Sequence, residues 1–177
     1  LRWPDVLTIE ESGDELITEA QQSFTLAVDQ LVEMRAREGK ELASLLDSRL
    51  VDIETTVEKL REETPAIIAH QHEKLLRRLD DIDVEVEQGR VEQELVILAQ
   101  KLDVAEELDR LVTHVLEVRR NLEADEPVGR RLDFLMQELN REANTLSSKA
   151  AAASTTMQAV DLKVSIEQMR EQIQNIE

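Results

Sequence analysis

The chain has no cysteine and no tyrosine, and only 2% of its 177 residues are aromatic. Without cysteine it cannot form a disulfide framework. The shortage of aromatic residues and of glycine argues against a protein built from sheets. No apolar run is long enough to cross a bilayer and no signal peptide is visible, so we expect no membrane partner and a cytoplasmic location.

The residues that are abundant favour helices. Leucine, alanine, glutamate, glutamine and arginine dominate the sequence, and all of them have high helix propensity. We therefore predict an all-α fold with long helices, a C-terminal helical hairpin or bundle and an extended N-terminal helical arm. The arm is expected over residues 1–89, which contain few strong turns, and the bundle over residues 90–177.

Individual helices follow from apolar spacing and from breakers. Ser12, Gly13 and Asp14 mark a helix start. Thr64-Pro65 predicts a second break, either a kink or a new helix start. A helix from about 91 to 122 should precede a turn at Pro127 and Gly129, then a helix through about 146. A closing helix is predicted by a heptad seam. Its members are Ala159, Leu162, Ile166, Met169, Ile173 and Ile176.

Two polar stripes lie on the helices that flank the Pro127 turn. At about 100° per residue, each stripe covers an arc of roughly 60°. The first contains Asp103, Glu107, Arg110 and His114, and the second contains Asp133, Gln137, Asn140 and Asn144. Helices joined by a short loop usually pack antiparallel. We therefore predict that the two stripes share one site, with Asp103, Glu107 and His114 near Gln137, Glu138 or Arg141, either within one chain or between subunits.

Net charge limits the kind of partner. The formal charge is −18, whereas affinity for nucleic-acid phosphates comes largely from lysine and arginine. An RNA-binding role therefore requires a local basic patch, bound cations or a further domain.

The same region carries a family resemblance. The matching residues are Gln93-Glu94, Asp103, Glu106-Glu107, Arg110-Leu111, His114, Val128-Gly129-Arg130-Arg131-Leu132-Asp133-Phe134, Gln137-Glu138, Asn140-Arg141-Glu142, Asn144-Thr145, Ser148-Lys149 and Glu171-Gln172-Ile173-Gln174-Asn175-Ile176-Glu177. With these residues, 90–177 resembles the C-terminal region of the YicC/YloC family of bacterial endoribonucleases. That family has an additional domain before this point and Leu1 is not a start methionine, so we expect a C-terminal portion.

The resemblance implies a metal-dependent endoribonuclease that hydrolyses RNA phosphodiester bonds within a ring-like homo-oligomer, expected to be a hexamer. It implies RNA but no DNA as partner, and Mn²⁺ or Mg²⁺ as cofactor. The expected metal ligands are Asp103, Glu106, Glu107 and Glu142, since both cations prefer oxygen. The expected catalytic residues are Glu107, His114 and Glu138, and the expected RNA contacts are Arg130, Arg131, Arg141, Lys149 and Lys163.

Each assignment has a structural alternative. Paired glutamates on a helix are usually a solvated face, and a single histidine is usually structural or exposed. The arginines and lysines would equally form internal ion pairs in so acidic a chain. The alternative function is a non-catalytic acidic helical assembly or scaffold module, and an isolated fragment without activity is a further alternative.

Overall fold

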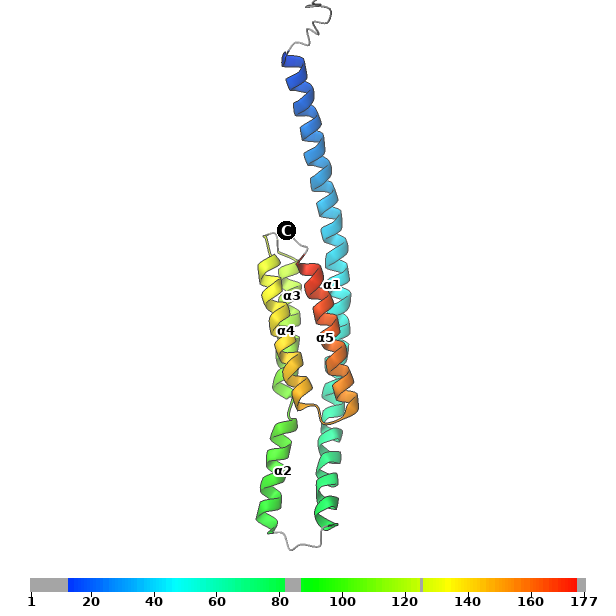
Figure 1. The fold of residues 1–177 in the computed structure, drawn as a ribbon, viewed down its shortest axis with the longest axis vertical. Helices are drawn as coiled ribbons and strands as arrows, with labels where there is room; N and C mark the ends of the chain where they lie inside the picture. The colour runs from blue at the N-terminus through cyan, green and yellow to red at the C-terminus, as the bar shows by residue number, and fades with distance from the viewer. Residues whose placement is uncertain (1–12, 82–86, 125, 175–177) are drawn as a thin grey trace, which may run out of the picture. The chain divides into compact units, whose positions relative to one another are not determined.

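The computed structural model describes residues 13–81, 87–124 and 126–174, and within these ranges every regular element is an α-helix (Figure 1). The prediction of an all-α fold is therefore confirmed. The helices are α1 (Gly13–Asp80), α2 (Gln88–Leu102), α3 (Ala105–Leu122), α4 (Gly129–Lys149) and α5 (Ala153–Ile173). None of the helices in the described ranges is long and apolar enough to cross a membrane.

The chain divides into two compact units, Leu1–Leu42 and Ala43–Glu177. In the first unit, the described residues form the opening part of α1 and none of their side chains is buried. The boundary thus lies well before the expected end of the arm at residue 89. The reason is that α1 has buried residues at helical spacing from Leu46 to Leu60, which belong to the core of the second unit.

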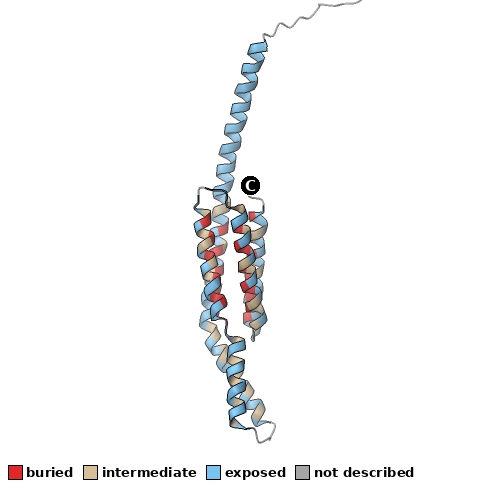
Figure 2. Cartoon of the chain, turned by 90° about the vertical axis from the view of Figure 1, so that its left-hand side faces the viewer, coloured by how far each residue is buried: buried red, intermediate tan, exposed pale blue. Residues whose placement is uncertain are grey.

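The core of the second unit lies where α1, α3, α4 and α5 present their apolar faces (Figure 2). From α1 it takes Leu46, Leu50, Ile53, Val57 and Leu60, whose spacing of 4, 3, 4 and 3 keeps them on one face. From α3 and α4 it takes Leu108, Leu111, Val115, Val118, Leu132, Leu135, Met136, Leu139, Ala143 and Leu146. Each buried leucine or isoleucine stabilises the fold by roughly 1.5–3 kcal/mol through removal from water.

The closing seam on α5 is confirmed. Ala159, Leu162, Ile166, Met169 and Ile173 are all buried. The last expected member, Ile176, lies outside the described residues. The heptad spacing therefore identified the face with which α5 closes the core.

Two predicted boundaries were wrong. The expected helix over 91–122 is two helices, because Asp103 adopts an extended backbone and its carboxylate accepts the Ala105 N–H at 3.0 Å. The new helix start that Thr64-Pro65 offered is absent, because α1 continues through it, whereas the alternative of a kink stays a prediction. A proline within a helix removes one backbone hydrogen bond and crowds the carbonyl four residues earlier, at a cost of about 3 kcal/mol that packing must offset. Burial of Leu60 and half-burial of Ile67 and Ile68 hold the chain helical on both sides of it.

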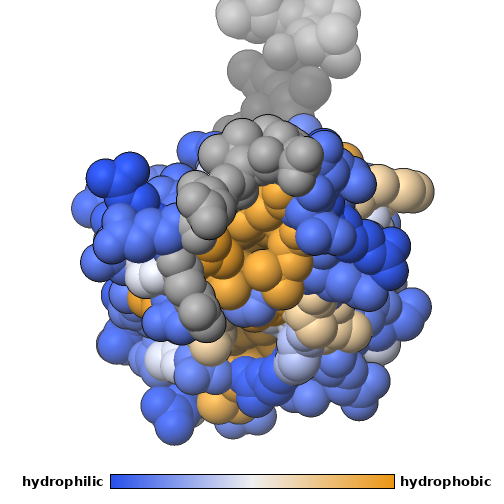
Figure 3. Space-filling model, turned by 90° about the horizontal axis from the view of Figure 1, so that it is seen from below, coloured by the Kyte–Doolittle hydropathy of each residue, from blue (hydrophilic) through white to orange (hydrophobic). Residues whose placement is uncertain are grey.

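The end of the second unit that contains α2 has a more open core. No described side chain of α2 is buried, and Leu76, Val96 and Ile97 are exposed apolar residues at this end. Seen from below, Figure 3 shows a hollowed apolar area with polar residues around it. The tight packing is therefore confined to the part of the unit where α3, α4 and α5 run together.

Arg119 of α3 forms the most extensive ion pairing to α1. Its guanidinium donates to both carboxylate oxygens of Glu54 at 2.6 and 2.8 Å, and to Asp47 at 2.8 Å. These hydrogen bonds, first to Glu54 and then to Asp47, raise the pKa of Arg119 further above its ordinary value. Forked arginine–carboxylate contacts are stronger than point contacts.

We expect Arg119→Met to lower the free energy of unfolding by roughly 1–2 kcal/mol, because it leaves two carboxylates without their cation. Urea denaturation measures the change. Arg120→Met is the matched control, since among the described residues Arg120 pairs with Glu117 on its own helix and is well exposed. Equal losses in the two variants would contradict a bracing role for Arg119.

Candidate functional site

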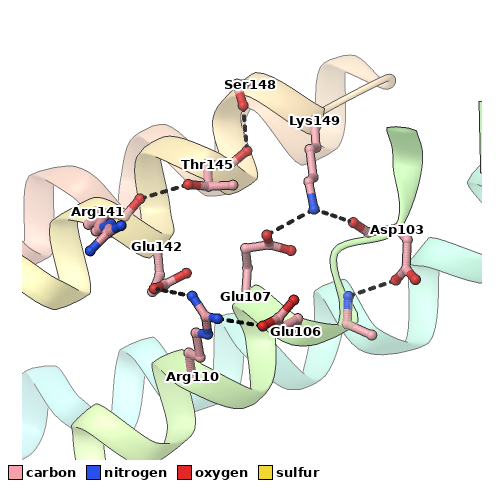
Figure 4. Close-up of polar contacts among 10 residues, drawn as sticks. Asp103, Glu106, Glu107, Arg110, Arg141, Glu142, Thr145, Ser148 and Lys149 are labelled. Carbon is pink, nitrogen blue, oxygen red and sulfur yellow. Dashed lines mark hydrogen bonds and ion pairs between the residues drawn. The ribbon is translucent and has the colours of Figure 1, made fainter. Parts of the chain in front are cut away.

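The antiparallel contact between α3 and α4 gathers six polar residues into one group, which we call the α3–α4 charge cluster (Figure 4). Its members are Asp103, Glu106, Glu107, Arg110, Glu142 and Lys149. All four predicted metal ligands are among them. In the structure these residues are joined through the cations of Arg110 and Lys149, and Asp103 takes part through its backbone carbonyl.

One branch of the cluster is organised by Lys149. Its ammonium donates to Glu107 Oε1 at 2.8 Å and to the backbone carbonyl of Asp103, also at 2.8 Å. The Glu107 side chain is only 9% exposed, and its second oxygen has no hydrogen-bond partner among the described residues. Lys149 thus neutralises a buried carboxylate and ties the end of α4 to the break between α2 and α3.

The second branch is organised by Arg110. Its guanidinium donates to Glu142 at 3.4 Å and forms a short contact with Glu106, one helical turn earlier. The hydrogen bond to Glu142, followed by the charge of Glu106, raises the pKa of Arg110. Because the Glu142 side chain is only 5% exposed, Arg110 supplies the charge that compensates this carboxylate.

Local sequence explains why the charges lie where they do. Glu106 and Glu107 occupy the first turn of α3, where the partial positive charge of the helix end favours carboxylates. Lys149 occupies the last turn of α4, where the opposite partial charge favours a cation. Antiparallel packing brings these two helix ends together, and so it brings the side chains into contact.

Within one chain, the predicted pairing of the two polar stripes is not what the structure shows. Glu142 lies about 170° around α4 from the centre of the second stripe. The residues of the second stripe form other hydrogen bonds. Gln137 donates to Asp133 of the same stripe at 2.8 Å, and Asp133 accepts from Arg170 of α5 at 3.2 Å. Asn144 donates to Asn140 at 3.3 Å along the same helix. The angular position of a stripe could not tell which neighbour, α3 or α5, it would meet.

The three predicted catalytic residues are not joined by any contact among the described residues. The Glu107 side chain is buried and forms an ion pair with Lys149. Glu138 is 25% exposed in its side chain and lies 3.9 Å from Arg141 on its own helix. His114 is half-buried on α3, and no hydrogen bond or ion pair of its ring is found among the described residues. Their catalytic roles stay predictions.

The predicted metal ligands do not fit a bound cation in this arrangement. No group of three or more histidine, aspartate or glutamate side chains in the described ranges is placed to hold a metal. Glu107 and Glu142 are instead compensated by Lys149 and Arg110, and the Asp103 carboxylate caps the start of α3. Cations that prefer oxygen would have to displace these internal partners first.

The predicted RNA contacts are spread over several surfaces. Arg130 and Arg141 are exposed on the same side of α4, whereas Arg131 points to another side and lies 3.4 Å from Glu126. Lys163 is half-buried on α5, and no partner for its ammonium is found among the described residues. Lys149 is committed to the charge cluster. Only Arg130 and Arg141 therefore share one open face, where Arg141 also lies 3.9 Å from Glu138.

Phe134 completes that face and was not selected from the sequence. Its side chain is 57% exposed. On the α4 helix it lies within about 40° of both Arg130 and Arg141, and Gln137 borders it on the same side. We call these four residues the α4 outer face. The sequence does carry a signal for an exposed Phe134, because this residue falls outside the apolar arc of its helix in a chain with very few aromatic residues.

The fold and these surfaces define an all-α bundle with an internally paired charge cluster and an outward arginine–aromatic face. A family model described as "Endoribonuclease YicC-like, C-terminal" matches residues 60–177. The chain therefore belongs to the YicC-like endoribonuclease family, and the resemblance noted from the sequence is confirmed.

Two curated relatives agree with this assignment. The chain is 47% identical over 178 residues to a probable endoribonuclease YicC of Haemophilus influenzae, covering all of this chain and 62% of the relative. It is 34% identical over 183 residues to a probable endoribonuclease YicC of Clostridioides difficile, covering 99% of this chain and 62% of the relative. The chain thus spans somewhat less than two thirds of their length.

Proposed function

We propose that this chain is the RNA-contacting helical part of an endoribonuclease, and that it contacts single-stranded RNA through the α4 outer face. The observation that carries the proposal is the exposed Phe134 between Arg130 and Arg141 on a helix that lies within the family match. The names of the two relatives, both probable endoribonucleases, support RNA cleavage as the activity.

The chemistry of this face suits unpaired RNA. An exposed aromatic ring offers a surface on which a base stacks, and every base can use it. Arginine binds a phosphate through two parallel hydrogen bonds. Gln137 adds an amide that donates and accepts hydrogen bonds at base edges. Because the whole chain carries −18, RNA binding would depend on this local face and would be sensitive to salt.

Metal dependence and a ring-like homo-oligomer, with a hexamer as the expected form, belong to the same proposal and are supported by the family resemblance. Mn²⁺ or Mg²⁺ would supply an activated water and charge stabilisation. The carboxylates of this chain are internally paired, so we assign them no step with the metal. Chelation by EDTA followed by return of Mn²⁺ tests the dependence, and light scattering with sedimentation tests the assembly.

The decisive test is cleavage of a labelled, unstructured RNA by the purified chain in Mn²⁺. We expect internal cleavage products, and we expect the triple variant Arg130→Gln, Phe134→Ala, Arg141→Gln to lose most of this activity at low RNA concentration. The triple variant, purified in the same way, also controls for a contaminating nuclease. Equal cleavage by both proteins would contradict the proposed contact face.

The second candidate function is a non-catalytic assembly module, favoured by the internal compensation of Glu107 and Glu142. Such pairs fix the register of packed helices without chemistry. RNA binding without cleavage under every metal condition would favour this candidate for the isolated chain. Cleavage that is lost on Glu138→Gln in a folded protein would favour the enzyme.

A further inference from the structure

The described residues of the first unit, 13–42, carry an exposed apolar seam. Over residues 13–42 no side chain is buried, although the helix has large apolar residues. Phe24 is 71% exposed, Ile17 is 55% exposed and Leu31 is 50% exposed. The seam consists of Ile17, Ala20, Phe24, Ala27, Leu31 and Met34, with spacings of 3, 4, 3, 4 and 3. Apolar residues whose spacing alternates between 3 and 4 are typical of a coiled-coil interface.

The order of large and small residues along the seam selects one pairing direction. In heptad notation, Ile17, Phe24 and Leu31 occupy the a positions, and Ala20, Ala27 and Met34 occupy the d positions. In a parallel pair, each position would meet itself, so Phe24 would oppose Phe24 and the alanines would oppose alanines. Such layers alternate between crowding and cavities, both of which destabilise a core.

An antiparallel pair gives layers of similar volume. Phe24 of one copy then opposes Ala27 of the other, and Leu31 opposes Ala20. Ile17 and Met34 form the outer layers, two residues of comparable size. No layer then pairs two phenylalanines or two alanines, so the crowding and the cavities of the parallel pair are both avoided.

Charge supports the same direction. Asp14 and Arg35 both occupy e positions. In the antiparallel register, Asp14 of one copy lies beside Arg35 of the other, and this contact occurs once at each end of the pair. In the parallel register, each e position lies beside a g position of the second copy, and the pairs so formed within this segment bring no opposite charges together. Opposite charges beside a seam favour one partner orientation over another.

We propose that residues 13–37 of two copies of this chain pair as an antiparallel two-stranded coiled coil. The pairing buries the six seam residues of each copy, with Leu16 and Val28 at its edges, and leaves Leu26 and Val32 outside. About three heptads give a weak, concentration-dependent contact rather than a permanent one. The proposal does not depend on RNA cleavage, because it uses only the sequence and exposure of the first unit.

Disulfide crosslinking of the whole chain tests the direction, since the natural sequence has no cysteine. The variants I17C and M34C, carrying different tags, are oxidised alone and after mixing. Antiparallel pairing predicts a mixed disulfide between the two variants and little crosslinking of either variant alone. Crosslinking of I17C with itself would show parallel pairing and overturn the proposal. The L26C variant, equally exposed but off the seam, is the control and should not crosslink above background.

Sedimentation provides a second, independent readout. Phe24→Asp should raise the concentration needed for half-association at least tenfold, whereas Leu26→Asp should leave it nearly unchanged. Asp14→Arg should weaken association, and adding Arg35→Asp in the same chain should restore it, because the two charges exchange places across the pair. Absence of both the mixed disulfide and the Phe24→Asp effect would refute the seam, whatever the ribonuclease activity of the chain.

Discussion

Replacing Lys149 by methionine is expected to lower the free energy of unfolding by about 2–4 kcal/mol. The Glu107 side chain is 9% exposed and has its ionic contact with Lys149, so the variant leaves a buried carboxylate without compensation. The substitution also removes the hydrogen bond to the Asp103 carbonyl at the break between α2 and α3. Urea denaturation followed by circular dichroism measures the loss.

The reverse substitution should be milder. Glu107→Gln leaves a lysine that is already 30% exposed and can turn towards water, and the glutamine oxygen can still accept a hydrogen bond. We expect a loss of about 1 kcal/mol. The double variant should be more stable than Lys149→Met alone, because the buried charge is then gone.

An exposed pair between α1 and α3 provides the control. Arg61 donates to Asp109 at 2.7 Å, but the two side chains are 48% and 73% exposed. Arg61→Met should therefore change stability by less than about 1 kcal/mol. A Lys149→Met variant no less stable than Arg61→Met would show that Glu107 reaches solvent and that the charge cluster does not stabilise the α3–α4 contact.

The helices and their buried faces could largely be predicted from the sequence. The seam from Ala159 to Ile173 and the spacing from Leu46 to Leu60 are local patterns, and burial follows directly from them. Tertiary context decided the exceptions. At Pro65 the local effect of proline predicts a kink or a new helix start, and no new start occurs because packing on both sides holds the helix together.

The site was less predictable because it depends on how helices face one another. Spacing placed Asp103 and Glu107 on one side of α3, but the residues of α4 that meet them depend on the rotation of α4 in the bundle. Periodicity alone gives a helix two polar borders beside its apolar face, and Glu142 lies on the border opposite the Asn140 stripe. Choosing between these borders requires knowing that α5 covers the other one.

A variant of the α4 outer face is expected to lose RNA affinity much more than stability. Phe134→Ala should weaken binding to a short unstructured RNA about tenfold, because base–aromatic stacking contributes roughly 1–3 kcal/mol. The ring is 57% exposed, so its removal leaves no cavity in the core. Fluorescence anisotropy of a labelled RNA measures the affinity, and circular dichroism checks the fold.

Arg130 and Arg141 should contribute to RNA affinity through ionic contacts with the phosphates of the RNA backbone. Arg130→Gln and Arg141→Gln should each weaken binding to all sequences alike. Each should reduce the dependence of affinity on salt by about 0.7 in the log–log slope, the value for one phosphate contact on a single strand. Combined with Phe134→Ala, the three substitutions should lower affinity on the order of 100-fold, since they remove one stacking and two ionic contacts.

Leu116→Ala is the matched control for the aromatic residue. Leu116 is 46% exposed on α3, so its truncation removes a similarly placed apolar side chain outside the α4 outer face. Its RNA affinity should equal that of the natural chain. If Phe134→Ala binds as well as Leu116→Ala, the ring does not stack on RNA. If the salt dependence of RNA affinity is also unchanged in Arg130→Gln and in Arg141→Gln, RNA binds elsewhere on the chain and the α4 outer face has another role.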